Sequence, residues 1–221
     1  MLTPQRIIYL HGLGGSPSSS KAMLIEQHFG LRGIQTVRMS LNIPSLQELS
    51  PVRAVESVIK EIGRHSPIPI AVIGSSFGAF VALHSLVRMA PHQRSHVTKI
   101  VLLAPLLEPW DPTSNLLNAE VEHQWRLDGS HPVLNMENNT EVPVHYRFVE
   151  ELKRLNKLAL AVHAPTYIVH GTRDLVVHPG QSERFASQQP HVTLQLVDDD
   201  HRLLSEPGRL VAIVEEFICK R

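Results

Sequence analysis

Short apolar runs alternate with amphipathic stretches along most of this chain. The runs are rich in branched residues and end in turn-forming residues, which is typical of buried parallel strands. We assign strands to them at residues 7–10, 35–39, 68–73, 97–104, 165–170 and 191–197. Stretches with apolar positions at helical spacing follow most of these runs. The alternation predicts an α/β fold with a mostly parallel sheet of about six strands and helices on both faces.

The alternation stops between residue 106 and about residue 161. Both tryptophans, Trp110 and Trp125, lie in this stretch. Apolar residues on either side of the Asn138-Asn139 turn predict a small hairpin. A helical face after it would hold Phe148, Leu152, Leu155 and Ala159. We interpret the stretch as a cap-like insertion over the carboxyl edge of the sheet, within a single α/β domain spanning residues 1–221. An ordinary surface excursion is the alternative.

The strongest chemical signal is the pentapeptide Gly74-Ser75-Ser76-Phe77-Gly78, which separates a strand pattern from a helix pattern. It matches G-x-S-x-G, where the serine occupies a sharp turn and glycines stand where a Cβ would collide with the crossing strand and helix. The string alone is a weak signal, and the strand before it and the helix after it strengthen it. We predict that Ser76 is a nucleophile, and we assign a structural role to His84 on the following helix.

Two further candidates follow later strands, so that nucleophile, acid and histidine occur in this order along the chain. Asp174 comes after the strand at 165–170, and His201 comes after the strand at 191–197. Serine needs an imidazole to take its proton, and the imidazole needs an acid to fix its tautomer. The chain has 14 histidines, so a histidine without a role in this turn is the alternative. The acids at 198–200 are rivals to Asp174, but immediate neighbours in sequence generally cannot reach across to the imidazole.

The loop at residues 11–16 contains three glycines and follows the first strand. Such a loop can direct backbone N–H groups at an oxyanion or a phosphate. It lacks the spacing of a P-loop or of a dinucleotide-binding turn. We therefore predict an oxyanion hole made by the backbone N–H groups of Leu13 and Phe77. Lys21 could touch a ligand, although a solvated lysine is the simpler interpretation.

Composition narrows the possible partners. Lys plus Arg and Asp plus Glu both number 21, so no net charge favours nucleic acid or an anionic membrane. The single cysteine, Cys219, cannot form an internal disulfide, and the beginning of the chain does not have the pattern of a signal peptide. These features favour a cytoplasmic protein with a small-molecule substrate. No motif has metal-ligand spacing, and we expect no metal and no cofactor. The oligomeric state is open.

These motifs resemble the α/β-hydrolase superfamily across nearly the whole chain. More narrowly, the chain resembles the small bacterial YqiA-like family, and this resemblance implies an esterase. The resemblance lies in the runs IYLHGL at 8–13, SPSSSK at 16–21, GSSFG at 74–78, HGTRD at 170–174 and DDHRL at 199–203. It implies a sheet that begins at what larger members count as their third strand. It also implies a triad of Ser76, Asp174 and His201.

The resulting hypothesis is a serine hydrolase that cleaves a small carboxylic ester through an acyl-serine intermediate. A thioesterase or an amidase would use the same triad. A receptor that binds a small ligand under the cap without turning it over is the alternative from a different class, because this fold also hosts receptors.

Overall fold

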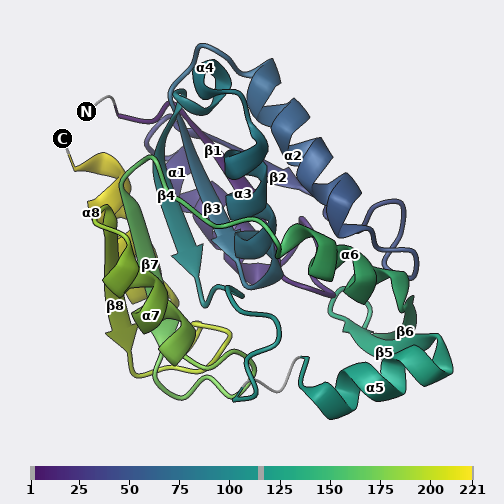
Figure 1. Ribbon diagram of the computed structural model, residues 1–221. Coiled ribbons are helices and arrows are strands. Elements are labelled where there is room, and N and C mark those ends of the chain that lie inside the picture. Colours follow the sequence, from purple (N-terminus) through teal and green to yellow (C-terminus); the bar gives the residue numbers. More distant parts are fainter. Residues whose placement is uncertain (1–2, 114–116, 221) are drawn as a thin grey trace.

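Six strands form one sheet in which every strand pairing is parallel (Figure 1). The computed structural model describes residues 3–113 and 117–220. The strand order is β2-β1-β3-β4-β7-β8. The bounds are β1 Arg6–Leu10, β2 Gln35–Met39, β3 Ile70–Ser75, β4 Val97–Leu103, β7 Thr166–Gly171 and β8 Val192–Val197. The predicted α/β class and six-stranded sheet are confirmed, with strand ends within two residues of those expected.

Helices cover both faces of the sheet, because each face buries its own apolar cluster. One cluster holds residues from α2 (Pro51–Arg64), α3 (Phe77–Arg88) and α7 (Gly180–Gln188). The other holds residues from α1 (Ser20–Gly30) and α8 (Pro207–Cys219). A short helix, α4 (Pro91–Arg94), links α3 to β4. Within the described ranges, no helix is both long enough and apolar enough to cross a membrane.

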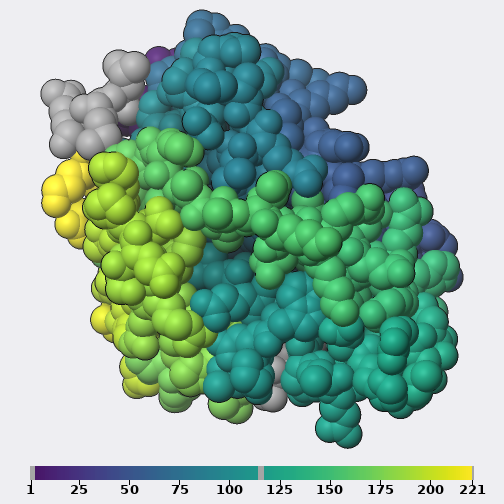
Figure 2. Space-filling view, in the orientation of Figure 1, coloured from purple at the N-terminus to yellow at the C-terminus, as the bar shows by residue number. Residues whose placement is uncertain are grey.

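The stretch after β4 forms a separate group of elements at one end of the sheet. It contains α5 (Ala119–Asp128), an antiparallel hairpin of β5 (Ser130–Asn135) and β6 (Thr140–His145), and α6 (Arg147–Leu155). In Figure 2 these residues, teal to green, form the lower right of the visible face. The predicted hairpin is present, whereas α5 was not foreseen. The prediction for Ala159 is wrong, because α6 ends at Leu155, before the polar pair Asn156 and Lys157.

A buried carboxylate ties this group to the rest of the domain. The Ser50 hydroxyl donates to Glu151 Oε2 at 2.5 Å, and the Val52 N–H donates to the same oxygen at 3.1 Å. A buried carboxylate is tolerated only when donors replace its lost water. Phe148 lies on α6, as does Glu151, and the centroid of its ring is 5.4 Å from the ring centroid of Phe77, the residue after the predicted nucleophile. The insertion is therefore packed directly against the Ser76 turn.

His84 on α3 is fully buried, and neither ring nitrogen has a hydrogen-bond partner among the described residues. Its ring lies 4.1 Å from the Phe80 ring. Burial, with a smaller effect from the Arg88 charge, lowers the pKa of His84 from 6.5 to about 4. An unfolded chain then binds one more proton than the folded chain between these pH values. The free energy of unfolding should therefore fall by about 3 kcal/mol from pH 7 to pH 4 through this group.

We expect His84→Leu to remove that part of the pH dependence and to raise the free energy of unfolding more at pH 5 than at pH 7.5. Leucine has a similar volume and leaves no buried polar atom without a partner. Urea denaturation at pH 5 and at pH 7.5 measures the effect. His163→Leu, at an exposed position, controls for the loss of one histidine. Equal pH dependence in wild type and His84→Leu would contradict the prediction.

Candidate active site

Ser76 lies at the apex of the turn between β3 and α3, with φ 53° and ψ −117°. A non-glycine residue at positive φ is strained, and such strain persists only where the surroundings hold it. The Ser76 N–H donates to the Leu103 carbonyl at 2.9 Å, and the Leu106 N–H donates to the Ser76 carbonyl at 3.2 Å. Both partners belong to the end of β4 or the segment directly after it. The neighbouring strand therefore holds Ser76 at the carboxyl edge of the sheet.

The two glycines that flank the serine stand where backbone leaves no room for a side chain. A Cβ on Gly74 would lie 2.6 Å from the Ala79 Cα, and a Cβ on Gly78 would lie 2.2 Å from the Leu10 carbonyl oxygen. The first approach brings α3 onto β3, and the second brings α3 onto the end of β1. The G-x-S-x-G spacing predicts this crowding.

Asp174 and His201 come together from the loops after β7 and β8. The distance from His201 Nδ1 to Asp174 Oδ2 is 2.6 Å, which is a short hydrogen bond between an imidazole and a carboxylate. Burial alone would raise the pKa of Asp174. The hydrogen bonds from His170 and His201 outweigh that effect and hold the pKa well below its usual range. Asp174 is therefore ionised at neutral pH and oriented toward the His201 ring.

The three rival acids are engaged elsewhere. Asp198 pairs with Arg173 at 2.9 Å on the surface. Asp199 accepts the Ser205 hydroxyl at 2.7 Å and its N–H at 3.1 Å. Asp200 accepts a backbone N–H two residues later in the chain. These carboxylates organise the turn that carries the imidazole, and none of them bonds to its ring.

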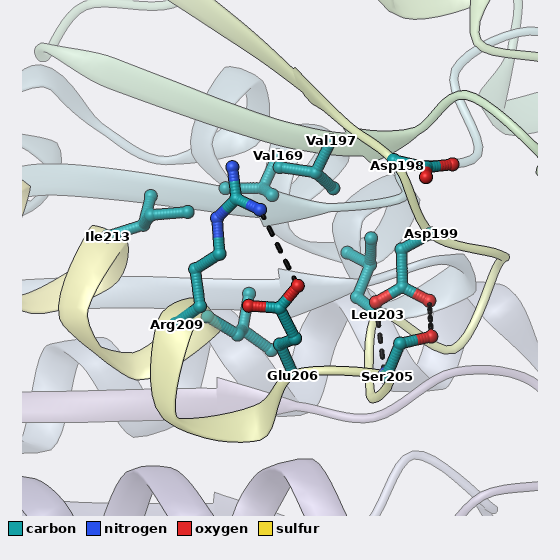
Figure 3. A pocket seen from close by; sticks show the side chains of 10 residues that line it. Val169, Val197, Asp198, Asp199, Leu203, Ser205, Glu206, Arg209 and Ile213 are labelled. Carbon is teal, nitrogen blue, oxygen red and sulfur yellow. Dashed lines mark hydrogen bonds and ion pairs between the residues drawn. The ribbon is translucent and has the colours of Figure 1, made fainter.

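A small pocket of about 20 Å³ lies against this turn (Figure 3). Figure 3 shows the Ser205 side chain directed at Asp199, and Arg209 of α8 paired with Glu206. A volume of this size accommodates about one water molecule. Ser76 is not among the lining residues. We therefore interpret the pocket as part of the support of the turn.

The loop after β1 approaches Ser76 closely. A Cβ on Gly12 would lie 3.3 Å from the Ser76 Cβ. The N–H of the next residue, Leu13, has no hydrogen-bond partner in the described part of the chain. Phe77 is the first residue of α3, so its N–H has no acceptor within the helix. Both amides that the sequence suggested for an oxyanion hole therefore remain available as donors.

His11, for which the sequence predicted no role, holds this loop in place. Its Nε2 accepts the Leu41 N–H at 2.9 Å, so its Nδ1 carries the hydrogen and donates to the Gly12 carbonyl at 2.8 Å. Burial lowers the pKa of His11, which favours this neutral ring. The ring joins the loop after β1 to the loop after β2. The sequence signal that could have indicated this role is the position of His11, directly after a strand and directly before Gly12.

The structure does not join all three predicted side chains by hydrogen bonds. The Ser76 hydroxyl makes none with any residue in the described ranges. Ser76 is 7% exposed, and the His201 side chain is 21% exposed, so solvent reaches both. Catalytic hydrogen bonds often tighten only when substrate is bound.

Lys21, at the start of α1, lies within electrostatic range of the triad acid. Its pKa is lowered to about 8 by burial, while the charges of Asp174 and Asp200 act in the opposite direction. The ammonium group is therefore near enough to the triad acid to interact with it electrostatically. No ion pair joins it to an acid among the described residues. Nor is any group of three or more His, Cys, Asp or Glu side chains in those ranges arranged to hold a metal ion.

One family model, described as "Uncharacterised protein family (UPF0227)", matches residues 6–215. No protein in the curated set matches.

Similar solved structures share the fold. Est1E from Butyrivibrio proteoclasticus with bound ferulic acid has a TM-score of 0.76 and 13% identity, over 99% of this chain and 89% of that one. Alpha/beta hydrolase domain-containing protein 10 from mouse has a TM-score of 0.75 and 19% identity, over 100% and 92%. A Paleococcus ferrophilus monoacylglycerol lipase has a TM-score of 0.73 and 17% identity, over 98% and 96%. The chain therefore has the α/β-hydrolase fold.

Proposed function

The chain belongs to the UPF0227 family, and from that membership and the geometry at Ser76 we propose that it is a serine hydrolase that cleaves a small carboxylic ester. The observation that carries the proposal is the 2.6 Å bond between His201 Nδ1 and Asp174 Oδ2, at the edge of the sheet where the Ser76 turn lies. A lipase and a protein with bound ferulic acid, among the solved structures with this fold, support the ester class.

The proposed reaction uses the chain's own groups in two steps. The Ser76 Oγ attacks the ester carbonyl while His201 Nε2 takes the hydroxyl proton. The Phe77 and Leu13 N–H groups would stabilise the tetrahedral oxyanion. Its collapse breaks the bond to the leaving alcohol, which takes the proton from His201. Water, deprotonated by His201, then attacks the acyl-serine. The bond to Ser76 Oγ breaks, Oγ takes the proton back from His201, and the acid is released.

Asp174 would serve both steps without changing its own charge. Its carboxylate holds the Nδ1–H of His201, which leaves Nε2 free to accept a proton, and it stabilises the imidazolium that forms. The depressed pKa of Asp174 keeps this charge in place. The same groups would serve a thioesterase or an amidase, which differ only in the leaving atom.

Labelling with a fluorophosphonate tests the proposal, because this reagent phosphonylates an activated serine far faster than an ordinary one. We expect one adduct per chain in the wild type by intact mass and none in Ser76→Ala. Matched oxygen, sulfur and nitrogen acyl compounds then separate esterase, thioesterase and amidase by their relative kcat/KM. Folded wild type that takes no adduct would contradict the proposal. A rise in melting temperature with an ester that is not turned over would favour a receptor.

A further inference from the structure

Asp174 is bonded to two imidazoles, and the proposed reaction uses only one of them. His170 Nε2 lies 3.1 Å from Asp174 Oδ2, the same oxygen that bonds to His201. The other carboxylate oxygen, Oδ1, accepts the N–H groups of Val176 and Val177, each at 2.9 Å. A carboxylate offers about four lone-pair positions. Four donors therefore occupy the whole acceptor capacity of Asp174.

The neighbours of His170 determine which of its nitrogens carries hydrogen. Nε2 lies 3.1 Å from Asp174 Oδ2 and 3.0 Å from the Val177 carbonyl oxygen, and both of these atoms are acceptors. Nε2 must therefore be the donor. Nδ1 lies 2.7 Å from the hydroxyl of Ser182 on α7, which donates to it when the ring is neutral. His170 and Ser182 are both fully buried, so no water replaces either partner.

We propose that His170 is a positioning residue that holds the Asp174 carboxylate for His201, through a relay that begins at Ser182. This inference rests on the proposed function, because it gives His170 a purpose only if His201 acts as a base. The relay gives Oδ2 a second donor besides His201. The backbone donors fix only Oδ1, so without His170 the carboxylate can turn about its Cβ–Cγ bond.

Because Asp174 is buried, losing the hydrogen bond from His170 should have a large effect. A buried carboxylate oxygen that loses one donor has no water to replace it, and hydrogen bonds to charged groups are the stronger kind. The Oδ2 charge would then be shared with a single donor, His201, instead of two. The His201 Nδ1–H proton would therefore lie in a stronger hydrogen bond, but to a carboxylate that is free to turn, so the ring would be less well oriented toward Ser76.

The experiment measures two quantities on the full-length protein. One is the second-order rate constant for fluorophosphonate labelling, and the other is the downfield ¹H resonance of His201 Nδ1–H. His170→Leu removes the donor at similar volume, and His170→Gln places an amide N–H where Nε2 stood. Ser182→Ala is a milder variant that leaves Asp174 and both histidines unchanged. Thr166→Val is the structural control, because it removes a buried hydrogen bond of 3.0 Å from the same strand.

We expect His170→Leu to label about tenfold to a hundredfold more slowly than wild type, a loss of the size found when a residue that orients a metal-binding side chain is removed. His170→Gln should recover most of that loss, and Ser182→Ala should label a few times more slowly. The Nδ1–H resonance should move downfield in His170→Leu and stay unchanged in Thr166→Val. Equal labelling of His170→Leu and Thr166→Val, with an unmoved resonance, would overturn the positioning role. Wild type that takes no adduct would instead contradict the proposed function.

Discussion

Asp174→Asn should lower kcat for ester hydrolysis by about 10⁴-fold, the size of loss known for this exchange in a Ser-His-Asp protease triad. The amide has almost the shape of the carboxylate, so the loop and its backbone contacts should survive. Its NH₂ group, however, cannot accept the His201 Nδ1–H. If the amide oxygen faces Val176 and Val177, the NH₂ group faces His201 and selects the tautomer whose Nε2 already carries hydrogen. Ser76 then has no base.

Steady-state kinetics with an activated acyl ester measure this loss, and KM should change little because Asp174 does not contact the substrate. Asp198→Asn is the matched control. That carboxylate is exposed and pairs with Arg173 on the surface, so its loss should leave kcat within about twofold. If both variants retained wild-type kcat, His201 would not depend on Asp174, and the assignment of the triad acid would be wrong.

The fold could be read from the sequence because its signals are local. The four inner strands of the sheet are largely apolar runs of five to seven residues, and parallel strands buried on both faces need that composition. The two edge strands, β2 and β8, are partly exposed and contain more polar residues. The Ser76 turn was recognisable for a similar reason. A Cβ added at either glycine would lie less than 3 Å from the backbone of α3 or of the end of β1, and this crowding recurs wherever this turn is built.

The parts that escaped prediction depend on contacts between distant segments. The Ser182 hydroxyl reaches His170 across twelve residues, from a helix to a strand, and nothing in local spacing signals that bond. The bond from Leu41 to His11 joins two loops thirty residues apart. Helix α5 was missed because only Trp125 is buried on it, so it has no apolar stripe. Its position depends on a hydrogen bond from the Trp125 indole to Val144.

Gly78→Ala should be the most destabilising of the small substitutions considered, with a loss of about 3 kcal/mol or more in the free energy of unfolding. The added Cβ would lie 2.2 Å from the Leu10 carbonyl oxygen and 2.7 Å from the His11 carbonyl oxygen. Both atoms are backbone, at the point where β1 ends, so no side chain can rotate away. Relief requires moving α3 away from the sheet or displacing the end of β1.

The higher helix propensity of alanine opposes this loss of stability, but its effect is small. Alanine favours a helix over glycine by about 1 kcal/mol, so a clash that relaxed easily would leave Gly78→Ala no less stable than wild type. Gly208→Ala measures the gain in helix propensity alone, because Gly208 lies in α8 and an added Cβ would meet nothing within 4 Å. Urea denaturation should show Gly208→Ala at or above wild-type stability and Gly78→Ala far below it.

If the two glycine variants were equally stable, α3 and β1 could separate freely, and the turn would not be held as its strained φ requires. If Gly78→Ala folds with reduced stability, its labelling rate adds a second test. Displacement of the end of β1 moves Gly12 and Leu13 relative to Ser76, so the oxyanion donors should fail together with the packing. Labelling should then fall more than the population of folded protein does, because a shift of 1 Å at a reacting centre is enough to slow the chemistry about a hundredfold.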